Sequence, residues 1–155
     1  MSSRSHGFVW RVLGFMNQRV ATRIIAGGGG PQRVVLLLTT TGRKSGLPRV
    51  TPLQFEEIDG AYYVGSERGA QADWFSNIVA NPRVEAQIQQ KHFTALAEPI
   101  TDPARVADFL ELRLQRHPVM IRAMLLMHGL VQPTRANIER LASNLALVAI
   151  RPKPS

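Results

Sequence analysis

The stretch that decides the fold of this chain reads LLLTTTGRKSGLPRVTP, from Leu36 to Pro52. Its first half is apolar and partly β-branched, which predicts a buried strand over residues 33–39. Its second half places basic and hydroxyl side chains around two glycines, and glycine lets a backbone turn tightly and come close to a ligand. Several charge-assisted donors in one turn suit a phosphate or a carboxylate, whereas a hairpin decorated with charge for solubility is the alternative. The side chains concerned are Arg43, Lys44, Ser45 and Arg49.

The rest of the chain alternates strand signals with helix signals. A second strand is expected over residues 49–57, where Pro52 indicates an edge or a bulge. Asp59-Gly60 predicts a hairpin turn, and Asp73 is expected to cap a short helix that Asn81-Pro82 ends. Further strands are expected over residues 61–66, 83–89, 92–100 and 145–150, and helices over 74–81, 102–117, 118–128 and 134–143. About six strands with short connections predict an α+β fold, a small antiparallel β-barrel with flanking helices.

Composition and charge narrow the classes of protein. The chain has 155 residues, of which 45% are hydrophobic, and this length suits one domain with its own core. The absence of cysteine excludes disulfides and cysteine-ligated metals and is consistent with a cytoplasmic protein; no metal site is expected. Eight basic and no acidic residues precede Glu56, whereas the two kinds balance from Glu56 onward, which indicates an anionic partner for the first part of the chain.

The N-terminal region is expected to form a basic amphipathic helix over residues 8–25, followed by a flexible linker at Gly27–Gly30. No run of 18 apolar residues predicts a membrane span. The helix is interpreted either as packed on the domain or as lying on a membrane surface or over a ligand groove.

The order and spacing of four motifs carry a resemblance to a known family. They are TTTGRKSGLPRVTP at residues 39–52, an aspartate-glycine hairpin, GSERGA at 65–70 and ADWFSNIVANPRV at 72–84. Together they resemble the deazaflavin (F420)-dependent nitroreductases and quinone reductases, which are small split-β-barrel oxidoreductases, over about residues 34–99. The resemblance implies a split β-barrel over residues 31–155 that binds F420, preceded by the helix and linker of residues 1–30.

The resemblance also implies which residues bind the phosphate and polyglutamate tail of the cofactor. They lie in the glycine-framed loop, where cations and backbone donors meet the need of a tail with several negative charges. They are Lys44, Ser45, Gly46 and Arg49, with Arg43 beside them.

Other residues would contact the remainder of the cofactor. By resemblance Thr51 and Pro52 would lie along it, and the short helix would flank it. A tryptophan at helical spacing is also explained as a core residue, and a serine at a strand end as a turn residue. The residues implied at the ring end and on the helix are Gly65, Ser66, Gly69, Trp74 and Asn77.

The C-terminal third departs from the family. Studied nitro-drug and quinone reducers carry C-terminal tyrosines, whereas Tyr62 and Tyr63 are the only tyrosines here. A methionine-rich segment either builds a different acceptor pocket or forms a packed helix face. Two histidines are conceivable proton donors that helix-end capping explains equally well, so no catalytic residue is assigned. The pocket candidates are Met120, Met124, Met127 and His128, and the histidines are His117 and His128.

We therefore expect an F420-dependent oxidoreductase that transfers a hydride from the reduced cofactor to a small electrophilic acceptor of the quinone or nitro type. The alternatives are a flavin mononucleotide (FMN) or haem protein, or a non-catalytic binder of cofactor or lipid, on the same barrel. No specific nucleic-acid partner is expected, because Phe8, Trp10 and Phe15 form no RNA-binding motif. Homodimerisation and membrane association through the N-terminal helix are left open.

Overall fold

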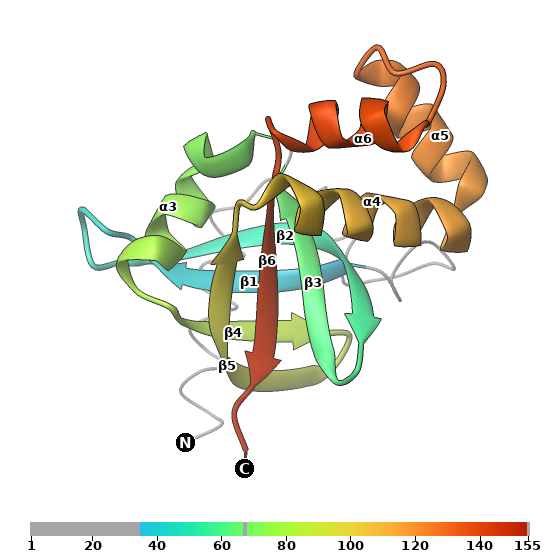
Figure 1. Cartoon of the computed structure of the whole chain (residues 1–155). Coiled ribbons are helices and arrows are strands. Elements are labelled where there is room, and N and C mark those ends of the chain that lie inside the picture. The colour runs from blue at the N-terminus through green and yellow to red at the C-terminus, as the bar shows by residue number, and fades with distance from the viewer. Residues whose placement is uncertain (1–34, 67, 155) are drawn as a thin grey trace.

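Six antiparallel strands form a closed barrel in the computed structural model, which describes residues 35–66 and 68–154 (Figure 1). Around the barrel the strands follow the order β1-β2-β3-β6-β5-β4, and β4 pairs back onto β1. The strands are β1 (Val35–Thr41), β2 (Pro48–Ile58), β3 (Ala61–Ser66), β4 (Arg83–Ile88), β5 (Lys91–Ile100) and β6 (Ala146–Pro152). The predicted α+β class and antiparallel barrel are confirmed.

Helices lie at one end of the barrel and over its outer surface (Figure 1). They are the short 3-10 turn η2 (Gly69–Gln71) and the helices α3 (Asp73–Ala80), α4 (Pro103–Arg116), α5 (Pro118–Met127) and α6 (Arg135–Ala142). Within the described residues, no helix is long and apolar enough to span a membrane. The helix expected over residues 8–25 and the linker at Gly27–Gly30 lie outside the described residues, so the division of the chain at residue 30 stays a prediction.

Alternation along the strands divides the apolar side chains between two clusters. In β6, Val148 and Ile150 belong to the cluster inside the barrel, whereas Leu147 and Ala149 pack outward with residues of α4 and α6. Phe75 of α3 belongs to the inner cluster. Helix α3 therefore closes the barrel interior, while α4 and α6 cover the outer face of β6.

Local sequence signals account for several turns and helix ends. Asp59 and Gly60 have φ angles of 51° and 82°, the two positive values that a type I′ hairpin requires. The Asp102 carboxylate accepts a hydrogen bond from the Ala104 N–H at 3.2 Å and caps α4. The predicted hairpin turn and the predicted start of the helix at residue 102 are confirmed.

The cap predicted for the short helix is wrong. The N-cap of α3 is Ala72, and no side chain caps the helix. Asp73 is the first helical residue instead, and its carboxylate forms an ion pair with Arg43 at 3.2 Å. A long-range cation therefore outcompetes the local backbone for this carboxylate.

Strand β2 is shared unequally by its two neighbours. Residues 48–54 pair with β1 but not with β3, which pairs only with residues 55–58. Pro52 lies in the part that has one neighbour, where its missing N–H breaks no ladder. The predicted edge position of Pro52 is confirmed, since this half of β2 pairs with β1 and not with β3.

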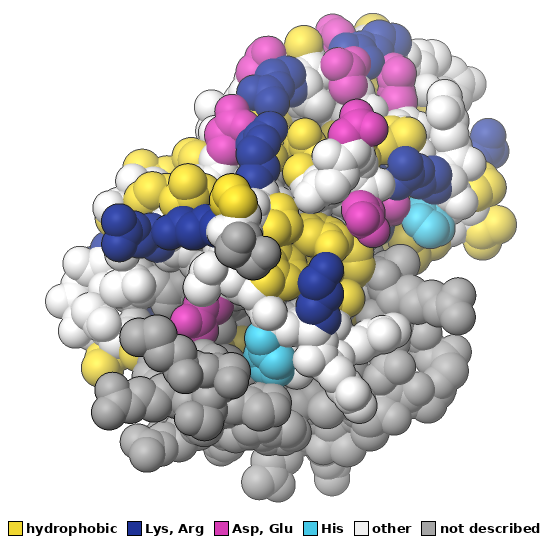
Figure 2. Space-filling model, turned by 90° about the horizontal axis from the view of Figure 1, so that it is seen from below, with side chains coloured by type: hydrophobic (Ala, Val, Ile, Leu, Met, Phe, Trp, Pro, Cys, Tyr) yellow, Lys and Arg dark blue, Asp and Glu magenta, His cyan; other side chains and the backbone are white. Residues whose placement is uncertain are grey.

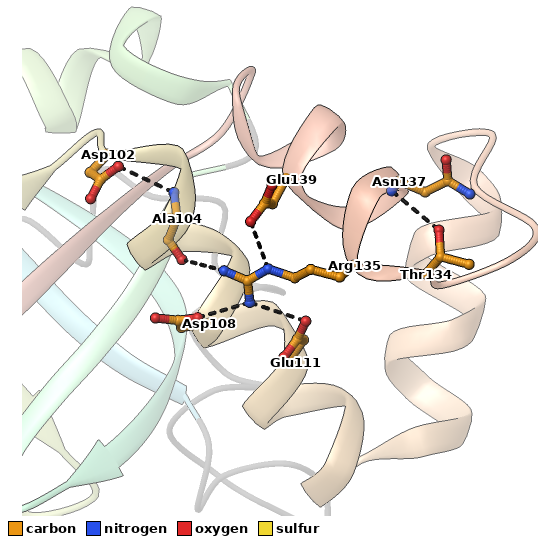
Figure 3. A network of polar contacts seen from close by, with 8 residues as sticks. All are labelled: Asp102, Ala104, Asp108, Glu111, Thr134, Arg135, Asn137 and Glu139. Carbon is orange, nitrogen blue, oxygen red and sulfur yellow. Dashed lines mark hydrogen bonds and ion pairs between the residues drawn. The ribbon is translucent and has the colours of Figure 1, made fainter.

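Helices α4 and α6 are joined by Arg135 (Figure 3). Its guanidinium contacts Glu139 at 2.7 Å, Asp108 at 2.8 Å and Glu111 at 3.1 Å. Hydrogen bonds that Arg135 donates to Glu139, and then to Asp108 and Glu111, raise the pKa of Arg135 above its ordinary value. This side chain therefore stays charged and holds the two helices in register over the barrel.

A buried carboxylate joins β2 to the end of α4. Glu56 is 5% exposed, and its oxygens lie 3.4 Å from Arg113 Nε, 3.1 Å from Arg116 Nη1 and 2.9 Å from His117 Nε2. Arg113 is itself 7% exposed and donates to Gln54 Oε1 at 3.0 Å. Removing one partner of such a buried group leaves the other charge uncompensated.

Glu56→Gln should therefore lower the free energy of unfolding by about 3 kcal/mol, measured by urea denaturation. Glu98→Gln is the matched control, because Glu98 pairs with two exposed arginines and should cost less than about 1 kcal/mol. Equal losses in the two variants would show that the Glu56 cluster does not anchor β2.

Gly69→Ala tests the close approach of η2 to the loop before β6. Gly69 has a φ of 60°, and an added Cβ would lie 2.8 Å from the Asn144 carbonyl oxygen. We expect a loss of more than about 2 kcal/mol in the free energy of unfolding, since a clash with backbone adds to the strain of positive φ. Gly129→Ala, with a φ of 79° and open space around it, should show the strain alone. The same loss in both would contradict the close approach.

Candidate functional site

The loop between β1 and β2 is held in shape by its own backbone. The Gly42 N–H donates to the Leu47 carbonyl at 2.7 Å, and the Gly46 N–H donates to the Gly42 carbonyl at 2.8 Å. Gly46 has a φ of 70°, and nothing lies within 4 Å of the position of an added Cβ. Gly46 therefore allows the tight turn that the sequence predicted, and no other residue covers its backbone on the side where a Cβ would lie.

Arg43 fastens this loop to α3. Its backbone N–H donates to Asn77 Oδ1 at 3.1 Å, and its Nη1 donates to the same oxygen at 2.9 Å. Its Nη2 lies 3.2 Å from the Asp73 carboxylate. The guanidinium is thus already neutralised, so Arg43 serves the position of the loop more directly than it could serve an anionic ligand.

Thr40, Arg43 and Asn77 form a hydrogen-bonded group that joins β1, the loop and α3, and this group is called the clamp below. Asn77 is its central member. It is 4% exposed, and its Nδ2 donates to Thr40 Oγ1 of β1 at 3.3 Å while its Oδ1 accepts both bonds from Arg43. One amide therefore ties α3 to a strand and to the loop that follows it. Asn77 lies where the resemblance expected a site residue, but its hydrogen-bonding groups are used inside the protein.

The remaining donors of this segment have no partner within the described residues. Lys44 and Arg49 are exposed and form no ion pair within the described part of the chain. In residues 35–66 and 68–154, no acceptor is found for the backbone N–H groups of Lys44 and Ser45. The Ser45 hydroxyl oxygen accepts from the Leu47 N–H at 3.1 Å, which orients its own O–H outward from that contact. Two cations and two backbone donors within one turn are the groups that an anion needs.

The first half of β2 presents two different faces. Arg49 is opposite Thr40 and Thr51 is opposite Leu38, and both partners point to the barrel interior and α3. Pro52 is opposite Leu37 and therefore faces the other way. Thr51 and Pro52 were both predicted to lie along the cofactor, but only Thr51 is on the same face of β2 as Arg49. A ligand on that face would meet the backbone of Pro52 and not its ring.

The residues predicted at the ring end lie at the end of β3, namely Gly65 and Ser66, and at the start of η2, namely Gly69. The Ser66 hydroxyl is buried and donates to the Gly69 carbonyl at 2.8 Å, which is the turn role left open by the sequence. Gly65 faces α4, where an added Cβ would meet the Phe109 ring at 3.9 Å. This segment leads directly through η2 into α3, so it adjoins the clamp.

Trp74 is half-buried on α3. It packs against the inner cluster, and its ring meets Phe75 edge-on at 6.2 Å between centroids. Its buried part serves the core, and its remaining part is an aromatic surface on α3.

Neither tyrosine of this chain can act from the predicted site. Tyr62 is 8% exposed inside the barrel, between the rings of Phe55 and Phe93, and Tyr63 packs on Phe109 under α4. His117 is bound to Glu56, as described above.

The methionine-rich segment does not gather into one pocket. Met127 is 88% exposed, whereas Met124 packs against the outer cluster. His128 lines a hollow between the loop after α5 and α6, and none of the three methionines lines that hollow.

Two cations that the sequence did not single out lie near the loop. A hollow of about 340 Å³ is lined by Thr41, Gly46, Arg83 and Lys153 among others. Arg83 and Lys153 lie at separated places in the chain, so no local spacing could have indicated them. On the face of the molecule seen in Figure 2, basic and acidic side chains are intermingled. This agrees with the equal numbers of basic and acidic residues from Glu56 onward.

Asn77→Ala should separate the loop from α3. The change removes the acceptor for two Arg43 donors and the donor to Thr40, so we expect a loss of about 2 kcal/mol in the free energy of unfolding and faster amide exchange of residues 42–47. Asp73→Asn is the matched control, since this carboxylate is 86% exposed and its ion pair is worth less than about 1 kcal/mol. Unchanged exchange in Asn77→Ala would contradict the clamp.

Comparisons with known proteins agree with this architecture. An F420H(2)-dependent quinone reductase of Mycobacterium tuberculosis is 36% identical over 63 residues, which cover 39% of this chain and 42% of that protein. The chain thus spans about two fifths of the length of the curated relatives it matches.

Solved structures share the fold. An F420 reductase matches with a TM-score of 0.54 and 17% identity, over 79% of this chain and 88% of its own. An F420-H2 dependent reductase (FDR-A) matches with a TM-score of 0.53 and 23% identity, over 77% and 95%. The sequence model of the family described as F420H(2)-dependent quinone reductase matches residues 15–122. Since this match covers more than half of the chain, the protein belongs to the F420H(2)-dependent quinone reductase family.

Proposed function

We propose that this protein is an F420-dependent reductase that passes a hydride from the reduced cofactor to a small electrophilic acceptor of the quinone type. The observation that carries the proposal is the loop of residues 42–47, whose backbone donors and Lys44 have no partner within the described residues. This loop precedes residues 48–54 of β2, which pair with β1 but not with β3 and are called the one-sided part of β2 below. Membership of the family supports the choice of F420 and of a quinone-type acceptor. A nitro-type acceptor is the second substrate class to test.

The residues present fit an anionic cofactor tail. Lys44, Arg49 and the N–H groups of Lys44 and Ser45 would hold it, and Gly46 lets it approach the backbone. Arg83 and Lys153 line the same hollow as Gly46 and supply two cations there against the one carboxylate of Glu85. Asn77 and Arg43 fix the loop beforehand, so little order has to be gained on binding.

For the rest of the cofactor, the protein would supply an apolar surface that orients the ring. When bound, F420H2 supplies the hydride, and the redox chemistry belongs to the cofactor. Thr51 and Leu53 of β2 and the exposed part of Trp74 would support an apolar ring, because Leu53 and Trp74 already pack at the edge of the inner cluster. Both tyrosines are buried in contacts with other rings, so neither would supply the proton for the acceptor, and solvent is the source we propose.

The first experiment titrates the full chain with F420, FMN and haem, read by fluorescence or absorbance. Lys44→Ala combined with Arg49→Ala should weaken F420 binding at least about tenfold and flatten its dependence on salt, since two charge-assisted contacts are lost. Lys91→Ala with Arg105→Ala removes the same charge on β5 and α4 and should leave binding unchanged.

Three results would contradict the proposal. They are failure to bind F420, binding of FMN or haem in its place, and equal weakening by the control pair. Oxidation of bound F420H2 by a quinone or a nitro compound, followed in a single turnover, then separates a reductase from a non-catalytic binder. Homodimerisation and contact of residues 8–25 with a membrane stay predictions.

A further inference from the structure

Helix α5 exposes apolar side chains instead of burying them. Val119 is 83% exposed, Leu126 56% and Met127 88%, and Val131 in the following loop is 77% exposed. The other large apolar side chains that the described residues leave exposed are Leu47, Val79 and Leu96, each on a different element. Single exposed apolar residues are ordinary, whereas a group on one helix and its loop indicates a contact surface.

The spacing shows that this is a continuous face. Val119, Ala123 and Leu126 follow one another at i, i+4 and i+7, the positions that share one side of a helix. Ile121 and Leu125, which are fully buried, lie on the other side. Helix α5 is therefore anchored by one apolar face and presents a second one outward.

The charges around this face have one sign. Arg122 lies between Val119 and Leu126 on the same side of the helix, and no acidic residue occurs from Leu112 to Ile138. The nearest following carboxylate, Glu139, is bound to Arg135 Nε at 2.7 Å on the side of α6 that meets α4 (Figure 3). Nothing acidic in this segment opposes an anionic surface.

A hollow lies at the C-terminal end of α5, beside the loop that follows this helix. It has a volume of about 450 Å³ and is lined by the loop after α5 and by α6. Val131 borders it, and His128, Asn137, Arg140 and Asn144 supply polar groups, whereas no carboxylate lines it. At a membrane surface, hydrogen-bond donors contact the lipid headgroups and apolar side chains enter the acyl chains below them, so this combination of groups suits such a surface.

We infer that the exposed face of α5, defined by Val119, Ala123, Leu126 and Met127, and the hollow at the C-terminal end of this helix dock this protein on the surface of an anionic lipid bilayer. The apolar side chains enter the acyl boundary, while Arg122 and Arg140 meet the phosphate groups. A second copy of the chain fits this surface less well, because a twofold contact would bring Arg122 against its own symmetry mate. The inference does not depend on the identity of the cofactor.

The absence of cysteine allows a site-specific test in the full chain. Met127→Cys carrying an environment-sensitive fluorophore should show a blue shift and increased emission with vesicles of phosphatidylglycerol and phosphatidylcholine. The same label at Val79→Cys, an exposed position on α3, should show neither change. Equal responses at both positions, or no response at position 127, would overturn the inference.

Vesicle partitioning measured by sedimentation tests the two components separately. Leu126→Gln with Met127→Gln should lower partitioning at least about tenfold, since two exposed apolar side chains no longer enter the bilayer. Arg122→Gln should lower it only on anionic vesicles. The matched controls Val79→Gln and Lys91→Gln should partition like the unmodified chain.

Unchanged partitioning of the α5 variants would place any membrane contact elsewhere in the chain and overturn the inference. So would a dimer, seen by light scattering, that the same variants dissociate, because the face would then serve a second copy.

Discussion

The structure depends on the difference in length between β2 and its neighbour β3, because β2 extends beyond the end of β3. Hydrogen bonds to β3 cover only residues 55–58, whereas those to β1 continue to residue 48. The paired part is anchored from outside by Glu56 and its three basic neighbours. The part that pairs with β1 alone, residues 48–54, begins directly after the basic loop. The barrel thus closes at one end of β2 and offers an edge at the other.

The clamp around Asn77 gives this edge a defined shape. An exposed loop of glycines and cations would ordinarily sample many conformations, and ordering it on binding would cost free energy. Here a buried amide joins the loop, β1 and α3 before any ligand arrives. Arg43 contributes its charge to this clamp, and Lys44 and Arg49 keep theirs for a ligand. Two arginines of the same motif therefore have different tasks.

Much of the fold could be predicted because its signals are local. Asp59-Gly60 requires no knowledge of the tertiary structure to form a hairpin, and Asp102-Pro103 begins a helix for reasons contained in four residues. The cap predicted for Asp73 was wrong because its partner, Arg43, is thirty residues away. The Glu56 cluster and the positions of Arg83 and Lys153 were not foreseen for the same reason. Sequence patterns indicated which residues carry charge near the site but not which charges are already paired.

The central claim is that the one-sided part of β2 and its basic loop bind F420. Amide chemical shifts of the full isotope-labelled chain, followed during a titration with F420, test it most directly. The account predicts the largest changes over Lys44–Arg49 and along residues 50–53, with smaller changes at Trp74. Changes confined to other parts of the barrel, such as the turn at Gln89 and Gln90, with the loop unaffected, would contradict it.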